Sequence, residues 1–467
     1  MSTELSNTVN ESRNFRKAGI IISLAAVCMM ACTEPPRTAS RRSSNNSNTN
    51  PDAGLNTAPD SGNNNSDSDT GTNTPVPDAG NNVTPDSGTN PPPRPDSGTN
   101  NPIDAGMMSP PDSGQPPAPS GLPILGNGQH TANSVNIQVI ARSADGLSQP
   151  TDVAFNPGTS DLWVVNQGDS TFTVLTMNGT SVSSNNIRGR GAHVHFLAKP
   201  SALAFGDFAG CETGFRCMAT SHDSLNDQPT ITGGAPNDFM GPSLWTSDTS
   251  MFSGSGPYHN AHYDMLHNSP QGKGIAWESG NAYYIFDGYH ESITRYDFHS
   301  THGPGGSDHS DGEISRWSQG FVSGVNGVPS HLEFDQSSDI LYIADTGNNR
   351  IASINTASGT RGQNYNEDYD GITGPSGGGM YYMQAPVNTV VSGSSTGMVQ
   401  PSGLAINATH IFVSDFSTGR IWAFTKSGTL VDYLETGKTG IAGMTFDSNG
   451  ALFVADRNRQ EILKITP

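Results

Sequence analysis

Hydrophobic residues divide the chain into two unlike parts, with a boundary near Leu122. Beyond this residue, short apolar runs are separated by turns rich in Gly, Asn and Asp. Within the runs the apolar residues are either continuous or alternate with polar ones, which indicates β-strands. Because no apolar period of 3.6 residues is sustained in this part of the chain, we expect it to be all-β.

The apolar runs recur as six similar units between Gln149 and Pro467. A unit opens with a run such as Pro401–Ile406 and continues with a second run, which ends in Asp in the last four units, as in Ile340–Asp345. A third run, such as Arg350–Ile354, completes most of the units. Units that cannot bury an apolar face alone are typical of repeat folds, and β-propellers repeat such strands radially around an axis.

One phrase of the fourth unit, Ile343–Ile351 (IADTGNNRI), resembles the NHL repeat, a motif of one propeller blade. In that family the Asp and the Arg brace the turn between two strands, which implies structural roles for Asp345 and Arg350. The resemblance is strong around Asp345, Asp415 and Asp456, and it is weak in the first two units. It implies an NHL-like β-propeller with one blade for each unit.

A closed ring of blades needs a strand that joins its two ends. The last unit stops at Ile462–Ile465, one strand short of a four-stranded blade. The run Asn136–Ile140, which precedes the first unit, can supply the missing outer strand and remove the exposed edge. We therefore predict an all-β, six-bladed β-propeller over residues 122–467.

The N-terminus has the charge pattern of an export signal. The basic segment Arg13–Lys17 precedes the apolar run Ala18–Ala31, which is typical of a signal peptide and too short to span a membrane as a stable helix. The end of this run, Met29–Cys32 (MMAC), resembles the bacterial lipobox, in which the Cys is lipidated after cleavage in front of it. The resemblance implies a lipid on Cys32, and Thr33 behind it implies the outer membrane. The alternative is an ordinary secretory signal with a chance Cys.

Residues 32–121, behind the signal peptide of residues 1–31, are rich in Asn, Asp, Ser, Thr, Pro and Gly. The motif PDAG or PDSG recurs in them from Pro51 to Pro111. Such a segment cannot bury enough apolar surface to offset its ordering entropy, so we expect a disordered tether. Its Asp residues are too far apart to converge on one calcium ion.

The charge balance bears on the partners of the protein. Lys and Arg number 23 against 43 Asp and Glu, which gives a formal net charge of −20. Nucleic acid is excluded as a partner, because phosphates need clustered cations and the sequence has no such cluster. We expect an exported monomer that contacts the outer membrane through its lipid anchor.

Cysteine usage predicts one disulfide bond. Cys211 and Cys217 are the only Cys residues behind the lipobox. In the oxidising compartment of an exported protein they are expected to pair, which would close the short loop between them. The alternative is a pair of free thiols.

Histidine is concentrated in the insertions of the second and third units, where ten of the 13 His lie between His193 and His309. Imidazole and carboxylate alternate there, which suits a divalent metal such as Zn or Ca. The candidate ligands are His222, Asp223, His262, Asp264, His267, Asp287, His290, Asp308, His309 and Asp311. At least three of them should approach one point if an ion is bound. The alternative is that these His cap turns and bond loop carbonyls.

A further resemblance concerns the peptide-amidating lyases, propellers that carry a catalytic zinc. The stretch Asp287–Ile293 (DGYHESI) is similar to one of theirs and places Tyr289 on their active-site tyrosine. His331 lies one position later than a zinc-binding His of that family. The positions of the zinc ligands hold Ser201, Ser330 and Ser402 here. The resemblance therefore does not extend to the lyase activity, and Tyr289 and His331 are kept as candidates on the loop face.

Two functions fit these observations. The first is a membrane-tethered β-propeller, at the cell surface or in the periplasm, that recognises a protein, peptide or glycan. The second is a metal-dependent lyase or hydrolase with a His/Asp site on the loop face, at the mouth of the central channel. We favour the binding module, because no complete catalytic set can be assembled and a fold alone does not define a function.

Overall fold

The computed structural model describes residues 121–467, with gaps at 179–180, 189–193, 208–210, 212–213, 226–238, 254–260, 306–307, 366–368 and 374–378. The signal peptide, Cys32 and most of the predicted tether lie outside the described residues. No helix in the described part of the chain is long and apolar enough to cross a membrane.

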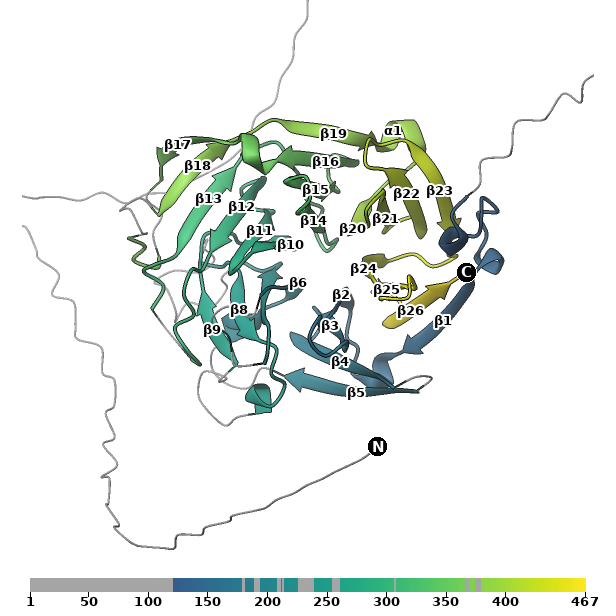
Figure 1. Ribbon diagram of the computed structural model, residues 1–467, viewed down its shortest axis with the longest axis horizontal. Helices are drawn as coiled ribbons and strands as arrows, with labels where there is room; N and C mark the ends of the chain where they lie inside the picture. Colours follow the sequence, from purple (N-terminus) through teal and green to yellow (C-terminus); the bar gives the residue numbers. More distant parts are fainter. Residues whose placement is uncertain are drawn as a thin grey trace, which may run out of the picture. The chain divides into compact units, whose positions relative to one another are not determined.

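Six β-sheets are arranged radially around a central axis, which confirms the predicted six-bladed β-propeller (Figure 1). Blade 1 contains β2 (Pro150–Phe155), β3 (Leu162–Asn166), β4 (Thr171–Asn178) and β5 (Ser181–Arg188). Blade 2 contains β6 (Pro200–Phe205), β7 (Cys217–His222), β8 (Ser243–Thr246) and β9 (His262–Met265). Blade 3 contains β10 (Gly272–Ser279), β11 (Ala282–Asp287), β12 (Ser292–Asp297) and β13 (Glu313–Trp317).

The other three blades repeat this arrangement. Blade 4 contains β14 (Leu332–Asp335), β15 (Ile340–Asp345), β16 (Arg350–Asn355) and β19 (Val387–Ser392). Blade 5 contains β20 (Pro401–Ile406), β21 (His410–Asp415), β22 (Arg420–Thr425) and β23 (Leu430–Glu435). Blade 6 contains β24 (Ile441–Phe446), β25 (Leu452–Asp456), β26 (Glu461–Thr466) and β1 (Asn136–Ala141).

Short helical turns lie between the strands. The 3₁₀ turns are Pro123–Leu125, Ala132–Ser134, Ser143–Asp145, Val194–Leu197, Met251–Ser253 and Thr356–Ser358. The one α-helical turn in the described residues is α1 (Gly393–Thr396). Residues 393–397 read GSSTG, which matches the letters of the GxSxG nucleophile motif, but this short turn leads toward β20 of the next blade and not into a helix that could support a nucleophile.

The ring is closed by a strand from the N-terminal side, as the sequence predicts. β1 pairs antiparallel with β26, with Ile137 opposite Ile465 and Val139 opposite Leu463. The segment in front of β1 is fixed to blade 5, because Asp432 accepts hydrogen bonds from the backbone N–H of Leu122, at 2.7 Å, and of Gly128, at 3.1 Å.

Acidic residues brace the turns after the second strands of blades 4 and 5. In blade 4 the buried Asp345 accepts hydrogen bonds from Arg350 Nε at 2.7 Å and from the backbone N–H of Ser323 at 2.8 Å. In blade 5 the buried Asp415 accepts a hydrogen bond from the backbone N–H of Val399 at 2.7 Å. Both carboxylates therefore anchor the chain as it enters a blade.

One part of the topology is absent from the sequence-based prediction. β17 (Thr360–Asn364) and β18 (Met380–Gln384) lie between the third and fourth strands of blade 4, yet they extend the sheet of blade 3. β18 pairs in parallel with β13, and β17 then forms the sheet edge. Ser318 fixes this hairpin, because its hydroxyl donates to the carbonyl of Ala385 at 2.7 Å and accepts from the Ala385 N–H at 3.3 Å.

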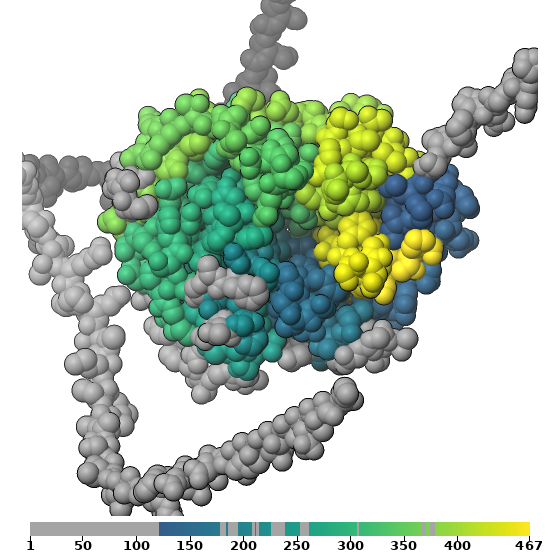
Figure 2. Space-filling model, viewed as in Figure 1, coloured from purple at the N-terminus to yellow at the C-terminus, as the bar shows by residue number. Residues whose placement is uncertain are grey.

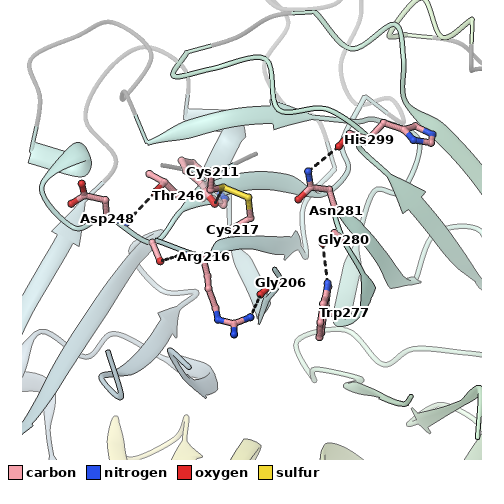
Figure 3. Close-up of a disulfide and its surroundings, with 12 residues drawn as sticks. Gly206, Cys211, Arg216, Cys217, Thr246, Asp248, Trp277, Gly280, Asn281 and His299 are labelled. Atoms are coloured by element: carbon pink, nitrogen blue, oxygen red, sulfur yellow. Dashed lines mark hydrogen bonds between the residues drawn. A yellow bond between two sulfur atoms is a disulfide. The ribbon is translucent and has the colours of Figure 1, made fainter. Parts of the chain in front are cut away.

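Cys211 and Cys217 are joined by a disulfide bond in the structure (Figure 3). Their Cα atoms lie 5.5 Å apart, which is a usual separation. Cys217 is the first residue of β7, and Arg216 beside it donates a hydrogen bond to the carbonyl of Gly206 at 2.9 Å (Figure 3). The bond and the Arg216 contact together hold the β6–β7 loop against blade 2.

Ring closure generates the first testable prediction. Deleting residues 134–142 removes β1, exposes the edge of β26 and uncovers apolar side chains of blade 6, so the variant should aggregate and melt at a lower temperature. Thermal unfolding and light scattering measure both effects. Deleting residues 51–111 serves as the control and should leave the melting temperature unchanged. Equal melting of the two variants would contradict closure by β1.

Candidate functional site

A cluster of His and Asp side chains lies at the outer edge of the ring, where blade 2 faces an insertion of blade 3. Asp264 belongs to β9, the outermost strand of blade 2, and its side chain is buried. The β12–β13 loop brings three residues toward it: His302, His309 and Asp311. His309 Nδ1 hydrogen-bonds to Asp264 Oδ1, and His302 Nδ1 lies 3.6 Å from Asp264 Oδ2. His302 Nε2 lies 3.3 Å from Asp311 Oδ1.

Two more imidazoles lie next to this cluster. His267 Nδ1 hydrogen-bonds to Asp370, whose carboxylate also accepts from the His267 backbone N–H at 2.9 Å. Its Nε2 is buried without a hydrogen-bond partner in the described part of the chain. Both ring nitrogens of His262 are in the same situation. The ring centroids of His267 and His309 are 6.3 Å apart, so the groups form one polar region.

Burial and mutual contacts set the ionisation of these groups. Burial raises the pKa of Asp264, and the hydrogen bond from His309 opposes that shift. Burial lowers the pKa of His309, but the hydrogen bond to Asp264 and its negative charge outweigh burial and raise the pKa overall. Burial, with the nearby imidazoles of His309, His195 and His267, holds the pKa of His262 well below its ordinary value. His262 is therefore a neutral imidazole, whose unprotonated nitrogen can accept a hydrogen bond or bind a metal ion.

The structure does not bring His222 and Asp223 to this cluster. His222 Nδ1 lies 2.8 Å from the carbonyl of Gly241, and burial lowers its pKa to about 4. Asp223 forms an ion pair with Lys273 at 3.1 Å. Both residues stabilise the junction of β7 with its neighbours.

The remaining predicted residues also act locally. Asp287 accepts hydrogen bonds from the backbone N–H of His290, at 3.0 Å, and from its ring Nδ1, at 2.9 Å, so the pair closes the β11–β12 turn. Tyr289 in that turn is 54% exposed. Asp308 is exposed and bonds Ser310.

The location of the cluster corrects one expectation. The sequence suggested that the His-rich loops gather beside the central channel, whereas β9 and the β12–β13 loop lie at the perimeter of blades 2 and 3 (Figure 1). Two members were not among the predicted ligands. His302 lies in the His-rich stretch, so a signal for it was present in the sequence. Asp370 lies in the β17–β18 loop, and without that hairpin nothing in the sequence connects it with His267.

The central channel holds a second group of titratable residues. The innermost strands of the blades surround a cavity of about 270 Å³, in the hollow seen at the centre of Figure 2. Asp152, His331 and Glu333 line it together with apolar side chains. His331 Nε2 lies 3.1 Å from the carbonyl of Thr151, and its Nδ1 lies 3.6 Å from Asp152 Oδ1.

A third feature is a broad concavity of about 1090 Å³ beside the β17–β18 hairpin. Its lining residues are uncharged: Ser318, Gln319, Phe321, Ser358, Thr360, Gly362, Gln363, Tyr382, Met383, Gln384, Ala385 and Pro386. The side-chain amides of Gln319, Gln363 and Gln384 form no hydrogen bond with other described residues. Phe321 is 59% exposed. The concavity thus offers hydrogen-bonding amides and an apolar ring to a ligand.

Comparisons with known proteins give no assignment. The sequence matches no protein-family model and no curated protein. An auxiliary nutrient binding protein from Bacteroides thetaiotaomicron is similar with a TM-score of 0.43 at 13% identity, covering 68% of each chain. One from Bacteroides ovatus gives 0.43 at 14% identity, covering 71% of this chain and 76% of that chain. A luciferin-regenerating enzyme gives 0.43 at 12% identity, covering 71% and 95%. These likenesses bear on neither the ligand nor the activity.

The carboxyl groups of the channel generate a pH prediction. Burial, with the nearby charge of Asp152, raises the pKa of Glu333 from 4.5 to about 8. The folded state therefore keeps a proton that the unfolded state releases. The stability that this proton supplies is fully present below pH 4.5 and is lost as the pH rises toward 8, by at most about 1.4 kcal/mol per pH unit. Glu333→Gln should abolish this loss, so its advantage in melting temperature should grow from pH 5 to about pH 8 and then level off.

The matched control is Glu291→Gln, because Glu291 is exposed on the turn between β11 and β12. Melting curves of the control should follow those of the unmodified protein at each pH. A constant difference between Glu333→Gln and the unmodified protein across this range would show that Glu333 is ionised in the folded state throughout.

Proposed function

We propose that this protein is an exported, lipid-anchored binding module that holds a neutral, hydroxyl-rich ligand, a glycan, in the concavity beside the β17–β18 hairpin. The observation that carries the proposal is the lining of that concavity by unbonded amides and aromatic rings, without a charged side chain. The membrane anchor is the lipid on Cys32, and the tether separates the propeller from the membrane surface. The protein acts as a monomer.

The chemistry of the lining selects the ligand class. A side-chain amide both donates and accepts hydrogen bonds, so Gln319, Gln363 and Gln384 can each pair with sugar hydroxyls. The aromatic faces of Phe321 and Tyr382 can cover the apolar C–H face of a sugar ring. A charged ligand would lose water without gaining an opposite charge in this lining, which is unfavourable. A neutral glycan meets all three conditions.

An extended peptide is the second candidate ligand. β17 is exposed along its whole length, and among the described strands it pairs with β18 alone, so its other edge could accept an added strand. Backbone pairing would not use the three amides, which is why the glycan is favoured. A metal-dependent enzyme remains the alternative function. The feature that favours it is the His/Asp cluster, not the concavity.

The ligand proposal predicts that Phe321→Ala and Gln363→Ala weaken glycan binding. Each removes a side chain that lines the concavity, so the dissociation constant should rise by about tenfold or more. A screen on immobilised neutral glycans identifies the ligand, and calorimetry with the best of them measures the affinity.

The matched controls are Tyr289→Ala and Gln336→Ala, which change an exposed aromatic residue and an exposed amide outside the concavity. Both should bind the glycan as the unmodified protein does. Binding of extended peptides in place of glycans would favour strand addition to β17. An affinity unchanged by all four substitutions would place the ligand elsewhere.

The anchor has its own prediction. Cys32→Ser removes the sulfur that would carry the lipid, so the protein should move from the membrane fraction to the soluble fraction. Mass spectrometry of the mature protein should find a lipid-modified Cys32 at its N-terminus. A free N-terminus at another residue, with the protein soluble, would refute lipidation.

A further inference from the structure

We propose that the protein binds one divalent transition-metal ion, of the zinc class, through Asp264, His302 and Asp311. The site joins the outer strand of blade 2 to the β12–β13 loop of blade 3. It is distinct from the concavity and does not depend on the ligand proposed for it.

The first observation is the convergence of the three side chains. One ligand atom from each lies within 4.8 Å of the other two. His302 lies between the two carboxylates: its Nδ1 is 3.6 Å from Asp264 Oδ2 and its Nε2 is 3.3 Å from Asp311 Oδ1. Ligands bound to zinc at roughly 2.0–2.2 Å in a tetrahedron lie about 3.3–3.6 Å from one another. One nitrogen of His302 would bind the ion, so a small approach of the three side chains from their present limit of 4.8 Å would give this spacing.

The second observation is that one possible ligand atom of each residue is shielded from water and has no hydrogen-bond partner among the described residues. They are Asp264 Oδ2, His302 Nδ1 and Asp311 Oδ1. The Asp264 side chain is only 1% exposed. A shielded, unpaired carboxylate oxygen is unfavourable, and native proteins rarely keep one without a partner. A cation between these atoms would satisfy all three at once.

The surroundings orient the ligands as in known metal sites. Asp264 Oδ1 is held by the backbone N–H of Met265, at 2.7 Å, and by His309 Nδ1, which leaves Oδ2 for the ion. Hydrogen bonds from a second layer of residues commonly fix ligating carboxylates in this way. His309 is therefore a positioning residue, not a ligand.

The donor set determines the class of metal. Calcium and magnesium prefer an all-oxygen shell, whereas an imidazole beside carboxylates suits zinc and its neighbours among the transition metals. Two carboxylates neutralise the charge of one dication. Three protein ligands leave a fourth position open for water or a further ligand, as in zinc sites that are not closed by four side chains.

The test uses the untagged full-length protein, stripped of metal with a chelator, dialysed and titrated with Zn²⁺ at neutral pH by calorimetry. We expect one equivalent to bind. His302→Ala and Asp311→Asn each remove a ligand and should weaken binding by at least about 100-fold. His309→Gln should weaken it by about 10- to 100-fold, because it removes only the orientation of Asp264.

The matched controls lie in the same loop. His299→Ala and Asp308→Asn repeat the two substitutions at residues outside the site, since His299 lies near Asp297 and the exposed Asp308 bonds Ser310. They should bind zinc as the unmodified protein does. A second readout is the melting temperature, which zinc should raise in the unmodified protein and both controls but not in His302→Ala or Asp311→Asn.

Three outcomes would overturn the proposal. The first is the absence of stoichiometric zinc binding, in which case His302 lies between the two carboxylates without an ion. The second is an affinity that His302→Ala and Asp311→Asn leave unchanged, which would place the ion elsewhere. The third is stoichiometric calcium binding without zinc binding, which would contradict the assigned class of metal.

Discussion

The pairing of β1 with β26 is the interaction on which the rest of the ring depends. Each apolar cluster of the propeller is shared by two neighbouring blades, and the cluster between blades 6 and 1 contains Phe453 and Ile462 from one and Val153 and Val164 from the other. β1 contributes Ala141 to the same cluster. Because the blades pack in a cycle, this strand both covers the edge of blade 6 and contributes to its apolar interface with blade 1.

In a closed ring of this kind, blades can differ through the insertions between their strands. Blade 3 shows how an insertion is accommodated: the outer edge of β13, exposed in a four-stranded blade, is covered by β18. The new edge, β17, is fully exposed and carries Arg361, a charge that discourages pairing with another chain. The hairpin also supplies Gln363, Tyr382 and Gln384 to the concavity and connects through Asp370 to His267. One insertion thus lines the concavity and also contacts the polar region next to the proposed metal site.

The repeat pattern was sufficient to predict the ring. In each of the six units most strands follow one another along the sequence, and the closing strand has its own alternation of apolar residues.

The hairpin could not be predicted in the same way. β13 and β18 pair in parallel although they lie far apart in the sequence, and the composition of neither strand indicates its partner. The His residues illustrate the same limit. His222 and His309 have similar sequence surroundings, yet a carbonyl of Gly241 fixes one ring and the carboxylate of Asp264 fixes the other. Only the tertiary contacts separate a structural His from one beside a site.

The two sites proposed at the perimeter lie at opposite ends of β13. Asp311 precedes the strand by two residues, and Ser318, which lines the concavity, follows it directly. A five-residue strand spans about 17 Å, so no single ligand of modest size contacts both. β13 is paired along its length with β12 on one side and with β18 on the other, and Trp317 at its end is buried. These pairings hold the strand whether or not an ion fixes the loop in front of it. Metal binding is therefore expected to leave the concavity unaltered, and the two sites can be tested separately.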